Sequence, residues 1–142
     1  MKLSIFTQHI WDMATDRGWT RDQAMEQAAG LGITGVEITY GEFQKILPAD
    51  YKAALDRHGL KTVCIHNSMP LCSGDELVFQ GALADGRTLI DTAALMGAPN
   101  VLIVASDGSD IANEEDRERA KSRMICGLRE LAAYGAARGV CA

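Results

Sequence analysis

The stretch LGITGVEITY, residues 31–40, decides the fold class of this chain. Gly32 is a helix stop, residues 31–34 make a short return, and residues 35–40 are rich in the β-branched residues of a strand. Similar strand-like runs recur along the chain, namely KLSIFT at residues 2–7, KTVCIH at 61–66 and NVLIVAS at 100–106. The sequence therefore predicts strands that alternate with helices.

Signals for helix ends separate these runs. A threonine–glutamine capping box at residues 20–23 opens one helix, Pro48 opens the next, and an acidic turn near residue 114 opens the last. Another helix spans about residues 75–96, where two internal glycines leave open a division into two helices. Residues 8–19, after the first run, are expected to be a polar loop.

Strand and helix alternate four times with connections too long for hairpins, which predicts parallel βαβ units and an α/β fold. A doubly wound sheet carries a glycine-rich turn after its first strand, whereas this chain has TQHIW at residues 7–11. Long polar loops after the strands favour instead the first half of a TIM (β/α)8 barrel. Residues 139–142 resemble the opening of a fifth strand, so we expect a single domain over residues 1–142 that is truncated there.

The composition argues against several classes of protein. Of 142 residues, 47% are hydrophobic and 23% are charged, as in ordinary globular domains, and a net charge of −5 provides no basic field for nucleic acid. There is no signal-peptide pattern and no run of the about 20 apolar residues that span a membrane, so we expect a cytoplasmic protein with no nucleic-acid or membrane partner. Four scattered cysteines lack metal or redox spacing and are expected to be small buried hydrophobes.

Four segments in order, KLSIFT at residues 2–7, GITGVEI at 32–38, RHGLKTV at 57–63 and MGAPNV at 96–101, resemble the sugar phosphate isomerase/epimerase family of xylose isomerase-like TIM barrels. The resemblance covers essentially the whole chain. It implies a metal-dependent enzyme that moves a proton between adjacent carbons of a small sugar or sugar phosphate. It also implies that the ligands of a divalent metal, Mn, Mg, Co or Zn, come from the second half of the barrel. We therefore expect this chain to hold no metal, to contribute no catalytic residue and to be inactive alone.

Glu37 is the strongest single candidate for a binding site. Val36 and Ile38 on either side place it on the opposite face of its strand, and it points into the barrel if those two face the helices. A buried carboxylate needs a partner. Glu37 therefore either forms part of the substrate site or binds an Arg, Lys or backbone group in the lumen.

His66 is predicted at the end of the third strand, on the face of Thr62 and Cys64 and at the mouth where barrel enzymes place functional groups. We expect it to bind a sugar hydroxyl, with a metal role or a structural role as alternatives. In family relatives that cleave damaged DNA, a metal-binding histidine follows the fourth strand. This chain has Ser106 and Asp107 there, which counts against that branch.

His9 and Trp11 follow the first strand, where an aromatic wall and an imidazole suit a sugar, unless the tryptophan only covers the barrel rim. Weaker candidates of the same kind lie at other strand ends, including Asp107. The predicted substrate-binding residues are thus Glu37, His66, His9, Trp11, Tyr40 and Asn67.

Two functions remain open from the sequence. The first is the N-terminal part of a metal-dependent sugar or sugar-phosphate isomerase or epimerase. The alternative is a non-catalytic half barrel that self-assembles or pairs with another chain. Open sheet edges and an inner face without its other wall predict a homo-oligomer.

Overall fold

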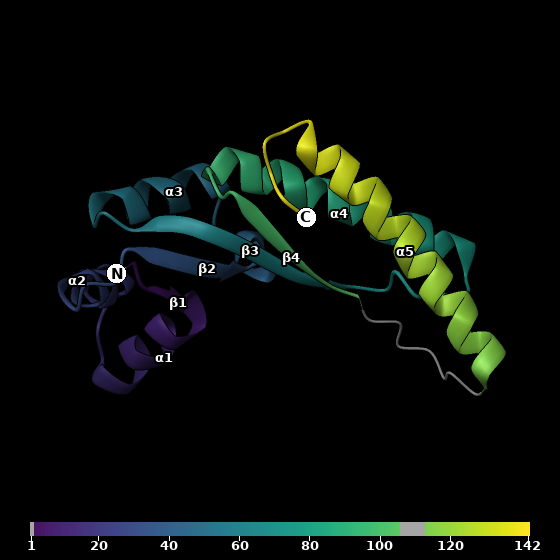
Figure 1. Ribbon diagram of the computed structural model, residues 1–142. Helices are drawn as coiled ribbons and strands as arrows, with labels where there is room; N and C mark the ends of the chain where they lie inside the picture. Colours follow the sequence, from purple (N-terminus) through teal and green to yellow (C-terminus); the bar gives the residue numbers. More distant parts are fainter. Residues whose placement is uncertain (1, 106–112) are drawn as a thin grey trace.

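The sheet of this protein consists of four parallel strands in chain order, β1-β2-β3-β4 (Figure 1). The computed structural model describes residues 2–105 and 113–142. The strands are β1 (Ser4–Phe6), β2 (Gly35–Thr39), β3 (Lys61–Met69) and β4 (Asn100–Ala105). The helices are α1 (Thr7–Arg17), α2 (Arg21–Gly30), the short 3-10 helix η1 (Tyr40–Gln44), α3 (Pro48–Arg57), α4 (Glu76–Met96) and α5 (Glu114–Ala136). This alternation confirms the predicted α/β fold. Of the helices in the described ranges, none combines the length and apolar character needed to cross a membrane.

Local signals set most helix ends where the sequence predicts them. In α2, the amide of Gln23 donates to Thr20 Oγ1 at 3.2 Å and Gln23 Oε1 accepts from the Thr20 amide at 2.9 Å, which is the predicted capping box. Pro48 begins α3, and the Asp75 side chain caps α4. The longest predicted helix is a single one, α4, and it ends at Gly97 in the left-handed region at φ 72°.

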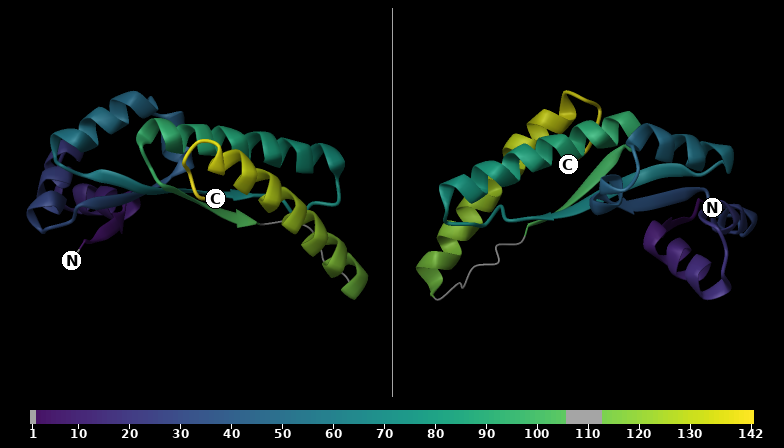
Figure 2. Two further views of the ribbon diagram at one scale, coloured as in Figure 1. Left: turned by 45° about the horizontal axis from the view of Figure 1, so that its top comes forward. Right: turned by 180° about the vertical axis from the view of Figure 1, so that it is seen from behind.

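The two glycines inside α4 lie in different surroundings. Gly81 is exposed, and a Cβ added there meets no atom within 4 Å. Gly86 is buried, and a Cβ there would stand 2.6 Å from a methyl carbon of Leu131 in α5. The absence of a side chain at Gly86 therefore lets α4 and α5 pack closely, and they lie side by side in both views of Figure 2.

Residues 8–19, predicted to be a loop, mostly form α1. The buried side chains of this helix, Thr7, Ile10 and Ala14, recur at intervals of three and four residues and make one buried stripe. The prediction was wrong because this stripe is short and the residues between its positions mix polar Gln8, His9 and Asp12 with apolar Trp11 and Met13. In addition, Phe6 occupies the N-cap position without a capping side-chain hydrogen bond, so the usual start signal is missing.

Along its pairing with β2, β3 contains one extra residue. The pairing with β2 passes from Thr62 directly to Cys64 and leaves Val63 as the extra residue of a β-bulge. Thr62 and Ile65 are consequently both buried, although strict alternation would place them on opposite faces. The prediction that Thr62 shares a face with His66 was wrong for this reason.

The core lies between one face of the sheet and the helices, with α3 and α4 on the same side in Figure 1. Val36 and Ile38 of β2 are fully buried in this core, which places Glu37 between them on the other face of the sheet. The opposite face is open among the described residues. We call it the uncovered face, and it is formed by Ser4, Phe6, Glu37, Thr39, Cys64, His66, Leu102 and Val104.

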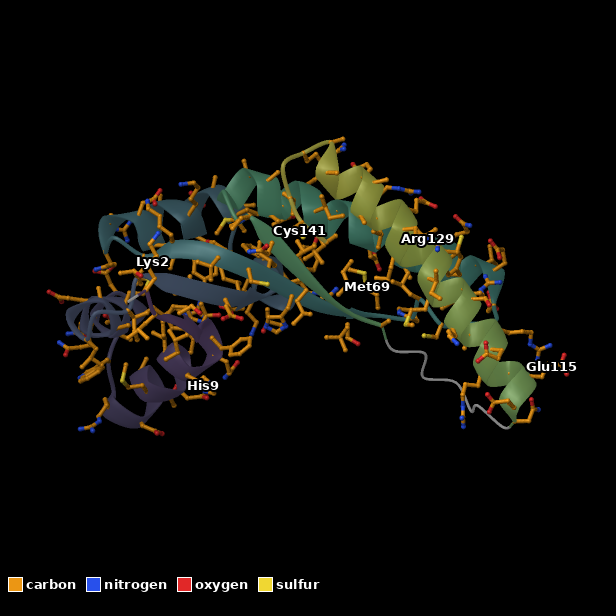
Figure 3. All side chains as sticks on the ribbon, viewed as in Figure 1. Lys2, His9, Met69, Glu115, Arg129 and Cys141 are labelled. Atoms are coloured by element: carbon orange, nitrogen blue, oxygen red, sulfur yellow. The ribbon has the colours of Figure 1, made fainter. Side chains whose placement is uncertain are left out.

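The chain returns to the sheet after α5. The amide of Cys141 donates to the carbonyl of Pro99 at 2.9 Å, and the amide of Val101 donates to the carbonyl of Cys141 at 2.8 Å. These bonds form a parallel bridge between Cys141 and Asn100, beside β4 in Figure 3. Val140 is buried at this point. The last residues thus extend the sheet beyond β4, where a fifth strand is expected.

Asp56 provides a test of surface electrostatics at the end of α3. Hydrogen bonds from Lys52 and Lys61, each at 2.6 Å, lower the pKa of Asp56 from 3.8 to about 2. A carboxyl whose pKa is lower in the folded than in the unfolded state stabilises the fold at pH values above its unfolded-state pKa. This stabilisation is lost as the pH falls through the folded-state pKa. Asp56→Asn is therefore expected to flatten the fall in melting temperature between about pH 4 and 2, measured by thermal unfolding at each pH. Asp85→Asn, an exposed change on α4, is the control, and equal slopes for the two variants would contradict the expectation.

Candidate functional site

An aromatic ring, an imidazole and a hydroxyl meet on the uncovered face. His66 Nε2 of β3 lies 3.0 Å from Thr39 Oγ1 at the end of β2. Phe6, at the end of β1, presents its ring edge-on to His66 with 5.3 Å between the ring centroids. Phe6 is 39% exposed and His66 is half-buried, so this cluster presents apolar and hydrogen-bonding surface side by side.

The position of His66 differs in one respect from the prediction. β3 continues to Met69, so His66 lies inside the strand and not at its end. The register nevertheless pairs His66 with Thr39, the last residue of β2, and with Leu102 of β4. His66 is therefore level with the carboxyl end of β2, at the edge of the sheet where barrel sites form.

Glu37 lies on the uncovered face, as predicted. The Ser4 hydroxyl of β1 donates to its carboxylate at 2.9 Å, and the Glu37 side chain is half-buried. Burial, together with the charge of Glu37, raises the pKa of the Cys64 thiol on the neighbouring strand. The Cys64 thiol is thus held in its neutral form beside a carboxylate.

The two candidates on α1 lie in different environments. His9 is exposed on α1 (Figure 3). Its ring stands edge-on to that of Phe6 with 6.2 Å between the ring centroids, so it borders the same cluster. The Trp11 indole N–H instead donates to Glu42 Oε2 at 2.6 Å, and the guanidinium of Arg21 lies 4.7 Å from the centre of its ring. Trp11 therefore belongs to a second cluster, with Glu42 of η1 and Arg21 of α2.

Tyr40 and Asn67 are not brought together with His66. Tyr40 begins η1 and packs its ring 6.0 Å from that of Phe43. Asn67 follows His66 in β3, so alternation places it on the helix-covered face with Met69. A further candidate, Asp107, lies outside the described residues.

Sequence analysis missed a carboxylate on which several elements converge. Glu42 of η1 has one oxygen 2.5 Å from Thr7 Oγ1, and its other oxygen accepts from Trp11 at 2.6 Å and from the Tyr51 hydroxyl at 2.8 Å. These four residues, with Arg21 over the indole, are called the Glu42 cluster below. Burial and the neighbouring charge of Glu42 raise the pKa of Tyr51 well above its ordinary value, so the phenol stays a donor.

The described residues do not form a complete metal centre. Within residues 2–105 and 113–142, no group of three or more His, Cys, Asp or Glu side chains could hold an ion. Glu37, Cys64 and His66 share a face, yet they form hydrogen bonds with Ser4, a backbone carbonyl and Thr39, respectively, rather than with one another. These residues alone therefore do not fit the metal site that the resemblance implies.

A hollow of about 340 Å³ lies at the opposite, amino end of the strands. It is lined by Lys2, Leu3, Ser4, Thr34, Gly35, Gly59, Lys61 and Val63. This lining includes none of the predicted site residues. The hollow and the Phe6–His66–Thr39 cluster are therefore separate features.

The family model of the xylose isomerase-like TIM barrel matches residues 25–141. Among solved structures, the chain is similar to D-psicose 3-epimerase with D-tagatose from Clostridium cellulolyticum, with a TM-score of 0.76, 19% identity, and coverage of 99% of this chain and 50% of that one. It is also similar to a sugar phosphate isomerase/epimerase from Parabacteroides distasonis, with a TM-score of 0.74, 16% identity, and coverage of 98% and 49%. For L-ribulose 3-epimerase the TM-score is 0.73, the identity 19%, and the coverage 99% and 48%. Among curated proteins, no match was found.

These similarities define the architecture. At identities below 20% the structures show the fold alone, and the chain spans about half the length of each of these barrels. The four βα units of this chain thus correspond to half of a TIM barrel, as predicted. Together with the family model, which matches most of the sequence, this shows that the chain belongs to the xylose isomerase-like TIM barrel family.

Proposed function

We propose that this chain is the N-terminal part of a sugar or sugar-phosphate isomerase or epimerase, and that its uncovered face binds one side of the substrate. The observation that carries the proposal is the Phe6–His66–Thr39 cluster. A sugar has apolar C–H faces and many hydroxyls, so an exposed ring beside hydrogen-bonding groups suits it. The family and the ketose epimerases of the same fold support this substrate class.

The side chains take separate roles in this proposal. His66 binds a substrate hydroxyl through its imidazole while Thr39 fixes the orientation of the ring. Glu37 accepts a hydrogen bond from a second hydroxyl, and His9 borders the site from α1. No direct contact with the substrate is assigned to the other predicted residues, Trp11, Tyr40 and Asn67, because they lie apart from the Phe6–His66–Thr39 cluster. The proton transfer between adjacent carbons is assigned to residues outside this chain.

We also propose that the divalent metal of this family takes its ligands from outside the described residues. When bound, such a metal polarises a carbonyl or hydroxyl of the substrate. In this view residues 1–142 are the first half of one barrel domain. Coverage of about half of each related barrel supports this view over a self-assembling half barrel. That the chain forms a homo-oligomer stays a prediction, and sedimentation velocity tests it by measuring the mass of the species in solution.

The affinity of the protein for ketoses tests the proposal. Calorimetric titration with D-psicose, D-tagatose and L-ribulose is expected to show binding that His66→Ala weakens by about tenfold, the effect of one lost hydrogen bond to a site of this kind. His58→Ala is the matched control, because His58 Nε2 lies 2.9 Å from Asp22 on the helix layer, away from the uncovered face.

Two outcomes would oppose the proposal. Absence of binding by the wild-type protein for all three ketoses would remove the role of the uncovered face. Equal losses for His66→Ala and His58→Ala would show that the effect comes from stability. Deuterium uptake into the ketoses in heavy water with added Mg²⁺ or Mn²⁺, read by mass spectrometry, measures proton transfer and is expected only when the rest of the barrel is supplied.

A further inference from the structure

The Glu42 cluster stands at the ends of the two strands that carry the proposed site. Thr7 follows Phe6 directly in the chain, and η1, which contains Glu42, begins directly after Thr39. Thr7 Oγ1 also lies 3.2 Å from the carbonyl oxygen of Glu37 in β2. The contact between Thr7 and Glu42 therefore fixes the exit of β1 against the exit of β2.

His66 contacts one residue from each of these strand ends, Phe6 and Thr39. A shift of one strand exit relative to the other would separate the ring of Phe6 from the hydroxyl of Thr39 and leave His66 with only one of them. We propose that Glu42 is a positioning residue whose carboxylate holds the two exits at the spacing that His66 needs. The proposal rests on the proposed function only for its effect on sugar binding.

The charge of Glu42 suits this role. The groups of Thr7, Trp11 and Tyr51 that meet it are hydrogen-bond donors, and an ionised carboxylate accepts from all of them without a proton of its own. Thr7 is 0% exposed and Tyr51 is 2% exposed, so both hydroxyls depend on protein acceptors. Loss of the acceptor therefore forces the Trp11 and Tyr51 donors to move or to remain unpaired, and it leaves the Thr7 hydroxyl only the carbonyl of Glu37.

Two substitutions separate the charge from the hydrogen bonds. In Glu42→Gln, the remaining oxygen accepts from Trp11 and Tyr51, while the Thr7 hydroxyl can turn to accept from the new amide. In Glu42→Leu, every acceptor is lost at similar volume. Glutamine is thus expected to keep the fold with a loosened cluster, and leucine is expected to release α1 from η1.

The matched control is Glu130→Gln. Glu130 pairs with Arg87 between α5 and α4, where both side chains are about two-fifths exposed. An exposed pair of this kind contributes little to stability. This variant therefore makes the same chemical change as Glu42→Gln at a carboxylate far from the uncovered face.

Proton NMR of the whole chain measures the positioning. The wild-type protein and Glu130→Gln are expected to show a cross-relaxation peak between the ring protons of Phe6 and His66, and a downfield Trp11 indole N–H bound to a carboxylate. Glu42→Gln is expected to move the indole signal upfield and to weaken the cross-peak, and Glu42→Leu to abolish it. Affinity for a ketose bound by the wild-type protein is expected to fall about tenfold in Glu42→Leu.

The outcomes distinguish this proposal from the proposed function. A Phe6–His66 cross-peak of wild-type intensity in both folded Glu42 variants would overturn the positioning role. If Glu42→Leu does not fold, Glu42→Gln decides by the same spectra. If no ketose binds but the cross-peak depends on Glu42, the proposed function fails and the positioning role stands. If ketoses bind and both variants keep the cross-peak, only the positioning role fails.

Discussion

Gly135→Ala is expected to detach the C-terminal end of the chain from the sheet. Gly135 is buried near the end of α5, and a Cβ there would stand 2.6 Å from the carbonyl oxygen of Val140. Backbone atoms cannot relieve such a contact by a side-chain rotation, so residues 140–142 have to move. These residues carry the hydrogen bonds that join Cys141 to Pro99 and Val101. The substitution therefore acts on the extension of the sheet beyond β4.

Hydrogen exchange is the measurement that checks this expectation. Overpacking costs about 1–3 kcal/mol, and a terminal segment can open while the rest stays folded, so the cost appears as local opening. Exchange at the amides of Val101 and Cys141 is expected to rise by about tenfold or more, while the Ile65 amide in β3 keeps its protection. Val140→Ala, which removes apolar contact without the clash, is the control and is expected to have a smaller effect. Equal exchange of Cys141 in Gly135→Ala and wild type would contradict the close contact.

Gly86→Ala is expected to destabilise the protein although alanine is the better helix former. A Cβ at Gly86 would stand 2.6 Å and 2.8 Å from the two methyl carbons of Leu131, which is fully buried. Alanine gains about 1 kcal/mol over glycine inside a helix, whereas overpacking costs about 1–3 kcal/mol. We expect a net loss of about 1 kcal/mol and a melting temperature lower by about 4 °C.

The same substitution at Gly81 is the matched control. Gly81 lies in the same helix with no atom within 4 Å of an added Cβ, so Gly81→Ala is expected to raise the melting temperature. The double variant Gly86→Ala, Leu131→Ala is expected to lose less stability than the sum of the two single changes, because the new methyl fills part of the cavity. If Gly86→Ala raised the melting temperature as Gly81→Ala does, the close packing of α4 on α5 would be refuted.

Helices with strong end signals were predictable because those signals act within a few residues. The capping box of α2 and Pro48 of α3 set their helix starts without help from the rest of the chain. The helix α1 was not predictable in this way, because Phe6 gives it no capping bond. Its stability comes from burying Ile10 and Ala14 against other elements, which a local pattern of polar and apolar residues shows only weakly.

The same distinction separates the two parts of the site. The placement of Glu37 on the uncovered face follows from alternation along its own strand. The Glu42 cluster instead joins Glu42 to Thr7 across 35 residues and to Trp11 across 31, and no short motif encodes such a meeting. Phe6 was omitted from the predicted site. The sequence did offer a signal, because alternation places the aromatic Phe6, at the end of its strand, on the face opposite to the partly buried Ile5.

The bulge in β3 determines which side chains of this strand reach the uncovered face. Before the bulge Thr62 faces the core, and after it Ile65 does. Every residue after the bulge therefore lies on the face opposite to the one that strict alternation from Thr62 would give it. If Val63 were paired as a regular strand residue, strict alternation from Thr62 would turn the imidazole of His66 beneath the helices and leave Ile65 in the open. What this strand offers to a ligand thus depends on the backbone conformation at Val63 as much as on the identity of its residues. The same residues in a strand without the bulge would present different chemistry on the uncovered face.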